Sequence, residues 1–172
     1  LERRPDLKNK VIFCQVGVPS RMDVQIYRLL SDSLCRISGY VNSSGNIDDT
    51  DIFFINNSVN FSELCALYSV ADVCVISSLR DGMNLVSLEY ISCEGNGALI
   101  MSDYAGATGM LIGAINVNPW SIDSLIDSYE SALEMNDEER IRRKKSMQSI
   151  VREYTATRWA ELFIKKLSEV KY

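Results

Sequence analysis

Short apolar runs alternate along this chain with longer segments in which apolar residues recur every three or four positions. The short runs lie at residues 11–16, 51–55, 73–76, 98–102 and 114–117. Because turn-forming or polar residues bound each run, we predict five buried strands. Strands that alternate with helices predict an α/β fold, with a Rossmann-like parallel sheet and helices on both faces.

The longer segments fit amphipathic helices. They lie at residues 23–37, 60–71, 84–93, 121–134, 136–154 and 157–170. Asn60 and Glu63 precede an apolar stripe that includes Tyr68, which is typical of a capped helix. Residues 39–50 are rich in Ser, Asn, Gly and Asp, so we predict a loop there.

The helix predicted at residues 136–154 is strongly charged. Its first turn is acidic, from Asp137 to Glu139, and basic residues follow from Arg140 to Lys145. This order complements the helix dipole, so we predict a solvated surface helix rather than a binding tract.

The stretch from Ser78 to Glu89 is the strongest candidate for a functional site. Gly82 lies in a tight loop after the strand at 73–76, where backbone can come close to a ligand. Glu89 lies about two helical turns further on, where its carboxylate can accept hydrogen bonds from hydroxyls. The helix start is expected to leave phosphate-attracting amides unpaired, those of Met83, Asn84, Leu85 and Val86. An anion site beside a diol site indicates a nucleotide.

A plainer interpretation of the same stretch stays open. Gly82 can simply permit a turn from strand to helix, and Asp81 can cap that helix. Any α/β domain needs such a turn, so spacing alone does not choose between the two interpretations.

The composition narrows the class of protein. Of the 172 residues, 47% are hydrophobic and 24% are charged, as in ordinary globular proteins. The net charge of -5 argues against a nucleic-acid surface, and no apolar stretch is long enough to span a bilayer. We therefore expect a soluble, cytoplasmic protein that binds neither nucleic acid nor membrane.

Histidine and cysteine usage restrict the possible chemistry. There is no histidine, which removes the usual zinc ligand and the commonest general base. We expect carboxylates, backbone amides and cations to act, unless the catalytic groups come from elsewhere. The cysteines stand alone in apolar segments and are interpreted as core residues rather than disulfides or metal ligands: Cys14, Cys35, Cys65, Cys74 and Cys93.

One string of residues favours the nucleotide site over a plain strand-to-helix turn. It is Leu79-Arg-Asp-Gly-Met-Asn-Leu-Val-Ser-Leu-Glu-Tyr90. They closely resemble the donor-site signature of trehalose-6-phosphate synthases, retaining glycosyltransferases of the two-domain GT-B type, and further matches follow along nearly the whole chain. The resemblance implies transfer of glucose from UDP-glucose to glucose 6-phosphate, giving trehalose 6-phosphate and UDP. It also implies that no metal or other cofactor is required.

The resemblance assigns roles around the donor. It implies that Asp81 meets a sugar hydroxyl as the catalytic carboxylate, that the amides from Gly82 to Val86 hold the diphosphate and glucose hydroxyls, and that Glu89 holds the ribose diol. It places Ser58, Val59 and Val16 beside the uracil. For the two valines, ordinary core packing is an equally good interpretation.

The resemblance also assigns the acceptor phosphate to Arg21, in Pro19-Ser-Arg21. The guanidinium suits that role because its fork can donate two hydrogen bonds to one phosphate. The alternative is that Arg21 pairs with a surface carboxylate such as Asp23.

The predicted organisation is one nucleotide-sugar-binding domain over residues 1–172, the C-terminal half of a GT-B fold. We expect a fragment that lacks the N-terminal acceptor domain and the first strand and loop of this domain, and that is inactive alone. Homo-oligomers or subunits of a synthase complex are possible partners. Two other functions stay open: a non-catalytic regulatory module of such a complex, and a GT-B transferase that uses another nucleotide sugar.

Overall fold

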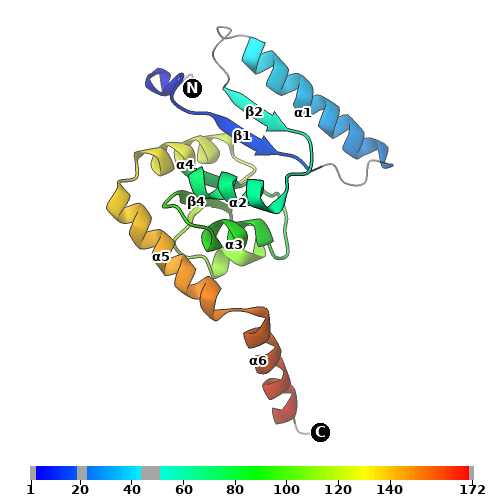
Figure 1. Cartoon of the computed structure of the whole chain (residues 1–172), viewed down its shortest axis with the longest axis vertical. Coiled ribbons are helices and arrows are strands. Elements are labelled where there is room, and N and C mark those ends of the chain that lie inside the picture. The colour runs from blue at the N-terminus through cyan, green and yellow to red at the C-terminus, as the bar shows by residue number, and fades with distance from the viewer. Residues whose placement is uncertain (1–2, 19–22, 44–50, 171–172) are drawn as a thin grey trace. The chain divides into compact units, whose positions relative to one another are not determined.

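The computed structural model describes residues 3–18, 23–43 and 51–170 (Figure 1). It divides into two compact units, Leu1–Asn60 and Phe61–Tyr172. Each unit contains a parallel sheet with at least one α-helix packed on it. The predicted α/β class with parallel strands is therefore confirmed.

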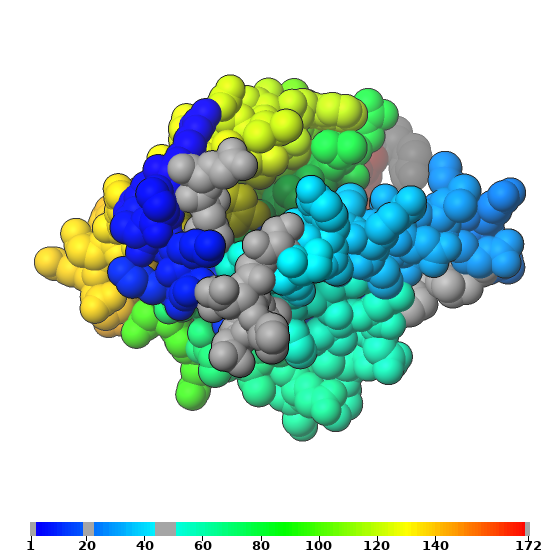
Figure 2. Space-filling model, turned by 90° about the horizontal axis from the view of Figure 1, so that it is seen from above, coloured from blue at the N-terminus to red at the C-terminus, as the bar shows by residue number. Residues whose placement is uncertain are grey.

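The first unit is built on two short strands. After a 3-10 turn, η1 (Pro5–Leu7), strand β1 (Phe13–Val16) pairs in parallel with β2 (Ile52–Ile55). The helix α1 (Gln25–Ser43) lies between them in sequence and packs beside β2. It is the light-blue region at the right of Figure 2, and it exposes several apolar side chains, among them Ile26, Leu29 and Tyr40.

Helix α1 runs further than the sequence indicated. Residues 39–43 were predicted as loop, but they are helical to Ser43. The reason is a long-range contact, because the Asn42 side chain donates to the oxygen of Ile52 at 2.8 Å and accepts from its amide at 3.0 Å. These two bonds tie the last turn of α1 to the start of β2, and they override the weak helix propensity of Gly39.

The second unit contains a three-stranded parallel sheet in the order β3-β4-β5. Its strands are β3 (Val73–Ile76), β4 (Ala98–Ser102) and β5 (Ile115–Val117). Its helices are α2 (Phe61–Val70), α3 (Leu85–Ser92), α4 (Ile122–Glu134), α5 (Asp137–Glu153) and α6 (Ala156–Glu169), with the 3-10 turn η2 (Gly106–Gly109) after β4. The predicted strands and helices of this unit are confirmed to within a few residues.

Strand β4 is buried along its whole length. Leu99 and Met101 contribute to one hydrophobic cluster with residues of α3 and α5, while Ala98 and Ile100 contribute to another with residues of α4. Successive side chains of a strand point to opposite faces, so one continuous apolar run supplies both clusters. This sheet thus has helices on both faces, as predicted.

The described strands are given as two sheets, one within each unit. The sequence predicted a single parallel sheet of five strands, whereas the structure has a two-stranded and a three-stranded sheet in separate units. Apolar runs predict that strands exist, but their lateral pairing depends on contacts between distant segments. The prediction of one domain over residues 1–172 stays a prediction.

The burial of some side chains differs from the prediction. Cys14 and Cys35 are exposed rather than core residues, whereas the other three cysteines are partly buried, and Cys74 packs against the core. Conversely, the charged helix α5 is not solvated on all sides, because Lys144 and Met147 are only 2% and 1% exposed. Lys144 lies on the stripe that α5 packs against the core, and its long aliphatic stem permits that burial.

None of the helices within residues 3–18, 23–43 and 51–170 is long and apolar enough to cross a membrane.

Candidate functional site

The loop after β3 is organised by the carboxylate of Asp81. One of its oxygens accepts from the amide of Met83 at 3.1 Å, and the other accepts from the side-chain nitrogen of Asn84 at 2.9 Å. Asn84, which is 8% exposed, caps α3 by accepting from the amide of Ser87 at 2.8 Å. The helix cap is therefore Asn84, not Asp81, and Asp81 instead fixes the loop.

Fewer of the amides at the start of α3 are unpaired than the sequence predicted. We predicted four unpaired amides, but that of Met83 is already bonded to Asp81. Leu85 and Val86 are the first two residues of α3 and are exposed, so their amides have no acceptor within the helix. These two remain the best placed to donate to an anion.

A second loop pairs with the first. The amide of Asp81 donates to the oxygen of Tyr104 at 3.1 Å, and the amide of Gly106 donates to the oxygen of Asp81 at 2.9 Å. Because both loops follow parallel strands, β3 and β4, they lie at the same edge of the sheet, as predicted. Their direct backbone pairing was not predicted, because nothing in either sequence marks it.

The glycines of the two loops have different surroundings. A Cβ atom on Gly106 would collide with the backbone oxygen of Gly82, so Gly106 is needed for the close approach of one loop to the other. A Cβ atom on Gly82 would meet nothing within 4 Å. Protein packing therefore does not require Gly82, and the space beside it is open to a ligand.

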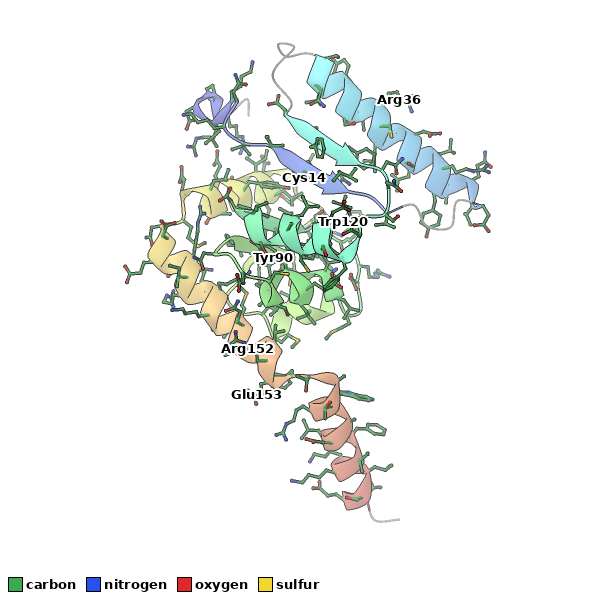
Figure 3. All side chains as sticks on the ribbon, viewed as in Figure 1. Cys14, Arg36, Tyr90, Trp120, Arg152 and Glu153 are labelled. Atoms are coloured by element: carbon green, nitrogen blue, oxygen red, sulfur yellow. The ribbon has the colours of Figure 1, made fainter. Side chains whose placement is uncertain are left out.

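Glu89 lies on the exposed side of α3 and contacts α2. The hydroxyl of Tyr68 donates to Oε2 of Glu89 at 3.1 Å. The Tyr68 ring also lies edge-to-face against the ring of Tyr90, with centroids 6.1 Å apart (Tyr90 is labelled in Figure 3). Burial, and then the hydrogen bond to Glu89, raise the pKa of Tyr68 above its ordinary value. The sequence placed Tyr68 on an apolar stripe, and no local signal indicated its contact with Glu89.

The predicted base-binding residues belong to the first unit. Val16 is paired with Ile55 at the carboxyl ends of β1 and β2, and Ser58 and Val59 follow shortly after β2. Ser58 is exposed, and its amide donates to the side chain of Asn57 at 2.8 Å. Val16 and Val59 are half-buried, so core packing and ligand contact both stay open for them. Arg21, the predicted acceptor-phosphate residue, lies outside the described residues.

The described ionisable side chains do not gather as metal ligands. Within the part of the chain that the structure describes, there is no group of three or more His, Cys, Asp or Glu side chains that could hold a metal ion. The prediction that no metal is required is a statement about the reaction, and it stays a prediction.

Comparison with known proteins decides the family. A sequence model of glycosyltransferase family 20 matches residues 1–169. The chain belongs to glycosyltransferase family 20. It is similar to the UDP-forming alpha,alpha-trehalose-phosphate synthase of Pichia angusta, with 43% identity over 173 residues that cover 99% of this chain and 36% of that protein. The enzyme of that name from Encephalitozoon cuniculi (strain GB-M1) is also 43% identical, over 164 residues, 94% of this chain and 36% of that protein.

Comparison with solved structures identifies the fold. A protein from E. coli bound with UDP-2-fluoro glucose matches this family-20 chain with a TM-score of 0.93 and 31% identity, covering 99% of this chain and 39% of that one. A UDP-forming alpha,alpha-trehalose-phosphate synthase from Burkholderia xenovorans in complex with glucose-6-phosphate matches with a TM-score of 0.91 and 36% identity, covering 97% and 38%. The predicted resemblance and the GT-B type of fold are confirmed. The family-20 chain spans little more than a third of the length of these relatives.

Proposed function

We propose that this family-20 chain is the donor-binding part of a UDP-forming trehalose-6-phosphate synthase. The enzyme would transfer glucose from UDP-glucose to glucose 6-phosphate with retention at the anomeric carbon, giving trehalose 6-phosphate and UDP. The observation that carries the proposal is the geometry of α3. Free amides at its start and the carboxylate of Glu89 farther along it suit the diphosphate and the ribose of one nucleotide.

Each residue of the loop then has a task. The amides of Leu85 and Val86 donate to the diphosphate, and open space beside Gly82 admits the glucose. The Asp81 carboxylate is oriented by Met83 and Asn84, and its remaining lone pairs accept from a glucose hydroxyl. A carboxylate held in this way loses little freedom when the sugar binds, which favours catalysis by correct orientation.

The other predicted contacts complete the proposal. Ser58 reads the edge of the uracil through its backbone, while Val16 and Val59 cover its face. Arg21 binds the phosphate of the acceptor. Amides and cations neutralise the leaving diphosphate, so we propose that the reaction requires no metal. An acceptor domain, oligomers, synthase-complex subunits and a cytoplasmic location all stay predictions.

The first test is calorimetric titration of the full-length protein with UDP and UDP-glucose, with GDP as the control nucleotide. We expect saturable binding that is selective for UDP and unchanged by EDTA. Glu89→Ala should weaken UDP binding about tenfold or more, because hydrogen bonds to a charged group are lost. Exposed Glu94 follows α3, so Glu94→Ala is a matched control that should bind like the wild type.

Two results would contradict the proposal. Equal binding of UDP and GDP would remove the assigned nucleotide. No binding of either nucleotide by the full-length protein would favour the non-catalytic module. Trehalose 6-phosphate formation should then be measured with UDP-glucose and glucose 6-phosphate, and a preference for another nucleotide sugar would favour a different transferase.

A further inference from the structure

Glu89 is an exposed side chain whose carboxylate is nevertheless held in place. A glutamate on the surface of a helix samples several rotamers, and ordering it for a ligand costs free energy. The hydroxyl of Tyr68 donates to Oε2 of Glu89 at 3.1 Å, across the contact between α2 and α3. This bond engages one oxygen and leaves further lone pairs of the carboxylate available to a ligand.

Tyr68 is itself fixed by the protein core. Its half-buried ring packs edge-to-face on Tyr90, with centroids 6.1 Å apart and planes inclined at 75°. Tyr90 is fully buried, and its own hydroxyl donates to the oxygen of Ala71 at 3.1 Å. A path of defined contacts therefore leads from the core, through two aromatic rings, to the carboxylate of Glu89.

The Tyr68 hydroxyl stays a donor under working conditions. Burial raises the pKa of Tyr68 first, and the hydrogen bond to Glu89 raises it further. The hydroxyl therefore keeps its proton throughout the neutral range, and Glu89 has a constant partner there.

We propose that Tyr68 is a positioning residue that preorients the Glu89 carboxylate to accept hydrogen bonds from the ribose diol of the donor nucleotide. This inference rests on the proposed function, because Glu89 must meet the ribose. Tyr68 itself makes no contact with the nucleotide in this arrangement. Its contribution is to reduce the ordering that Glu89 undergoes on binding.

The test is Tyr68→Phe in the full-length protein, which keeps the ring on Tyr90 and removes only the hydroxyl. UDP and 2′,3′-dideoxy-UDP are titrated by calorimetry. We expect Tyr68→Phe to weaken the binding of UDP about three- to tenfold, the range of one hydrogen bond, and to leave the binding of the dideoxy analogue unchanged. In a Glu89→Ala background, Tyr68→Phe should have no further effect on UDP, because the two residues act as a unit.

Tyr129→Phe is the matched control. Tyr129 is another half-buried tyrosine of the same unit, packed against the cluster of Ala98 and Ile100 on the opposite face of the sheet. We expect this variant to bind both nucleotides like the wild type. In steady-state assays Tyr68→Phe should raise the KM for UDP-glucose with little change in kcat, because it alters binding of the ribose and not the transfer step.

The outcomes separate this inference from the function on which it rests. If Glu89→Ala weakens the binding of UDP no more than that of the dideoxy analogue, the ribose assignment is wrong and Tyr68 has no such role. If Glu89→Ala weakens UDP binding selectively but Tyr68→Phe does not, the ribose assignment stands and the positioning role is overturned. Equal weakening of both nucleotides by Tyr68→Phe would also overturn it, because that result indicates a general structural defect.

Discussion

The ammonium nitrogen of Lys144 lies 2.9 Å from the backbone oxygen of Tyr90 and 4.2 Å from the centroid of the Tyr90 ring. The bond links α5 to the last turn of α3, where helix carbonyls lack partners within the helix. Lys144 is almost completely buried, and this burial lowers its pKa from the ordinary value. The core of the second unit thus contains a cation that has one hydrogen-bond acceptor and one aromatic face.

The first prediction concerns Lys144→Met and pH. Because the pKa of Lys144 is lower in the folded than in the unfolded state, the unfolded state binds the proton more tightly. The free energy of unfolding of the wild type therefore gains a contribution as pH rises from the folded pKa towards the ordinary value of 10.5. We expect the stability of Lys144→Met, measured relative to the wild type by urea unfolding, to be lower at pH 10.5 than at pH ~7.

Lys145→Met is the control for this comparison, since Lys145 is adjacent and exposed. Its stability difference from the wild type should be the same at both pH values. Parallel pH curves for Lys144→Met and the wild type would show that Lys144 titrates alike in both states, contrary to the prediction.

The second prediction concerns Arg140, whose side chain is only 14% exposed. Its guanidinium donates to the backbone oxygens of Ala132, Leu133 and Met135, at 3.0 to 3.2 Å, and so satisfies the end of α4. Arg140→Ala should lower the free energy of unfolding by about 2–3 kcal/mol, because charged hydrogen bonds are lost and carbonyls are left without partners. Arg140→Lys should recover only part of this, since an ammonium cannot reproduce the fork.

Arg142→Ala supplies the comparison on the same helix. Arg142 is 71% exposed and pairs with Glu139, and such surface pairs contribute about 0–1 kcal/mol. Urea unfolding that gives equal losses for Arg140→Ala and Arg142→Ala would show that Arg140 does not act as the cap of α4.

The third prediction separates the two loop glycines. Gly106→Ala would place a methyl group against the backbone oxygen of Gly82, so we expect a loss of about 1–3 kcal/mol in the free energy of unfolding. Gly82→Ala has free space around it, so its stability should be unchanged or slightly raised, by up to about 1 kcal/mol.

The proposed function makes a separate prediction for ligand binding. Gly82→Ala should weaken the binding of UDP-glucose although the protein stays folded. Thermal unfolding together with calorimetry checks both parts, and normal UDP-glucose affinity in Gly82→Ala would remove that glycine from the site.

The fourth prediction concerns thiol reactivity. Burial raises the pKa of Cys74 to about 12, whereas Cys35 is exposed. The thiolate is the reactive form, so iodoacetamide at neutral pH should label Cys35 readily and Cys74 only when the protein unfolds. Peptide mass spectrometry after timed labelling, with and without urea, measures both rates. Comparable labelling of the two thiols in the folded protein would contradict the packing of partly buried Cys74 against the core.

Much of the fold follows from local sequence. The apolar run at 98–102 predicts β4, and its period of two supplies both hydrophobic clusters of the second unit. Ser121 and Asn136 each cap the helix that the sequence predicted after them. These features depend on residues that are close in the chain, so sequence patterns are sufficient to find them.

For the candidate site, local sequence patterns predicted only part of the structure. The string from Asp81 to Glu89 indicated a donor site and its family, and the family is confirmed. The same string did not predict that Asp81 would bind Met83, or that Gly106 would pack on Gly82. A side chain in a loop has several nearby partners of similar chemistry, and only the folded backbone selects among them.

The sequence by itself determined the alternation of strands and helices, the position of the loop after β3 and the family to which the chain belongs. Only the tertiary structure decided that Asn42 extends α1, that Tyr68 holds Glu89 and that Lys144 lies buried against Tyr90. Each of these contacts joins residues from different elements. Their free energy depends on burial and on distance, and a sequence carries neither until the chain has folded.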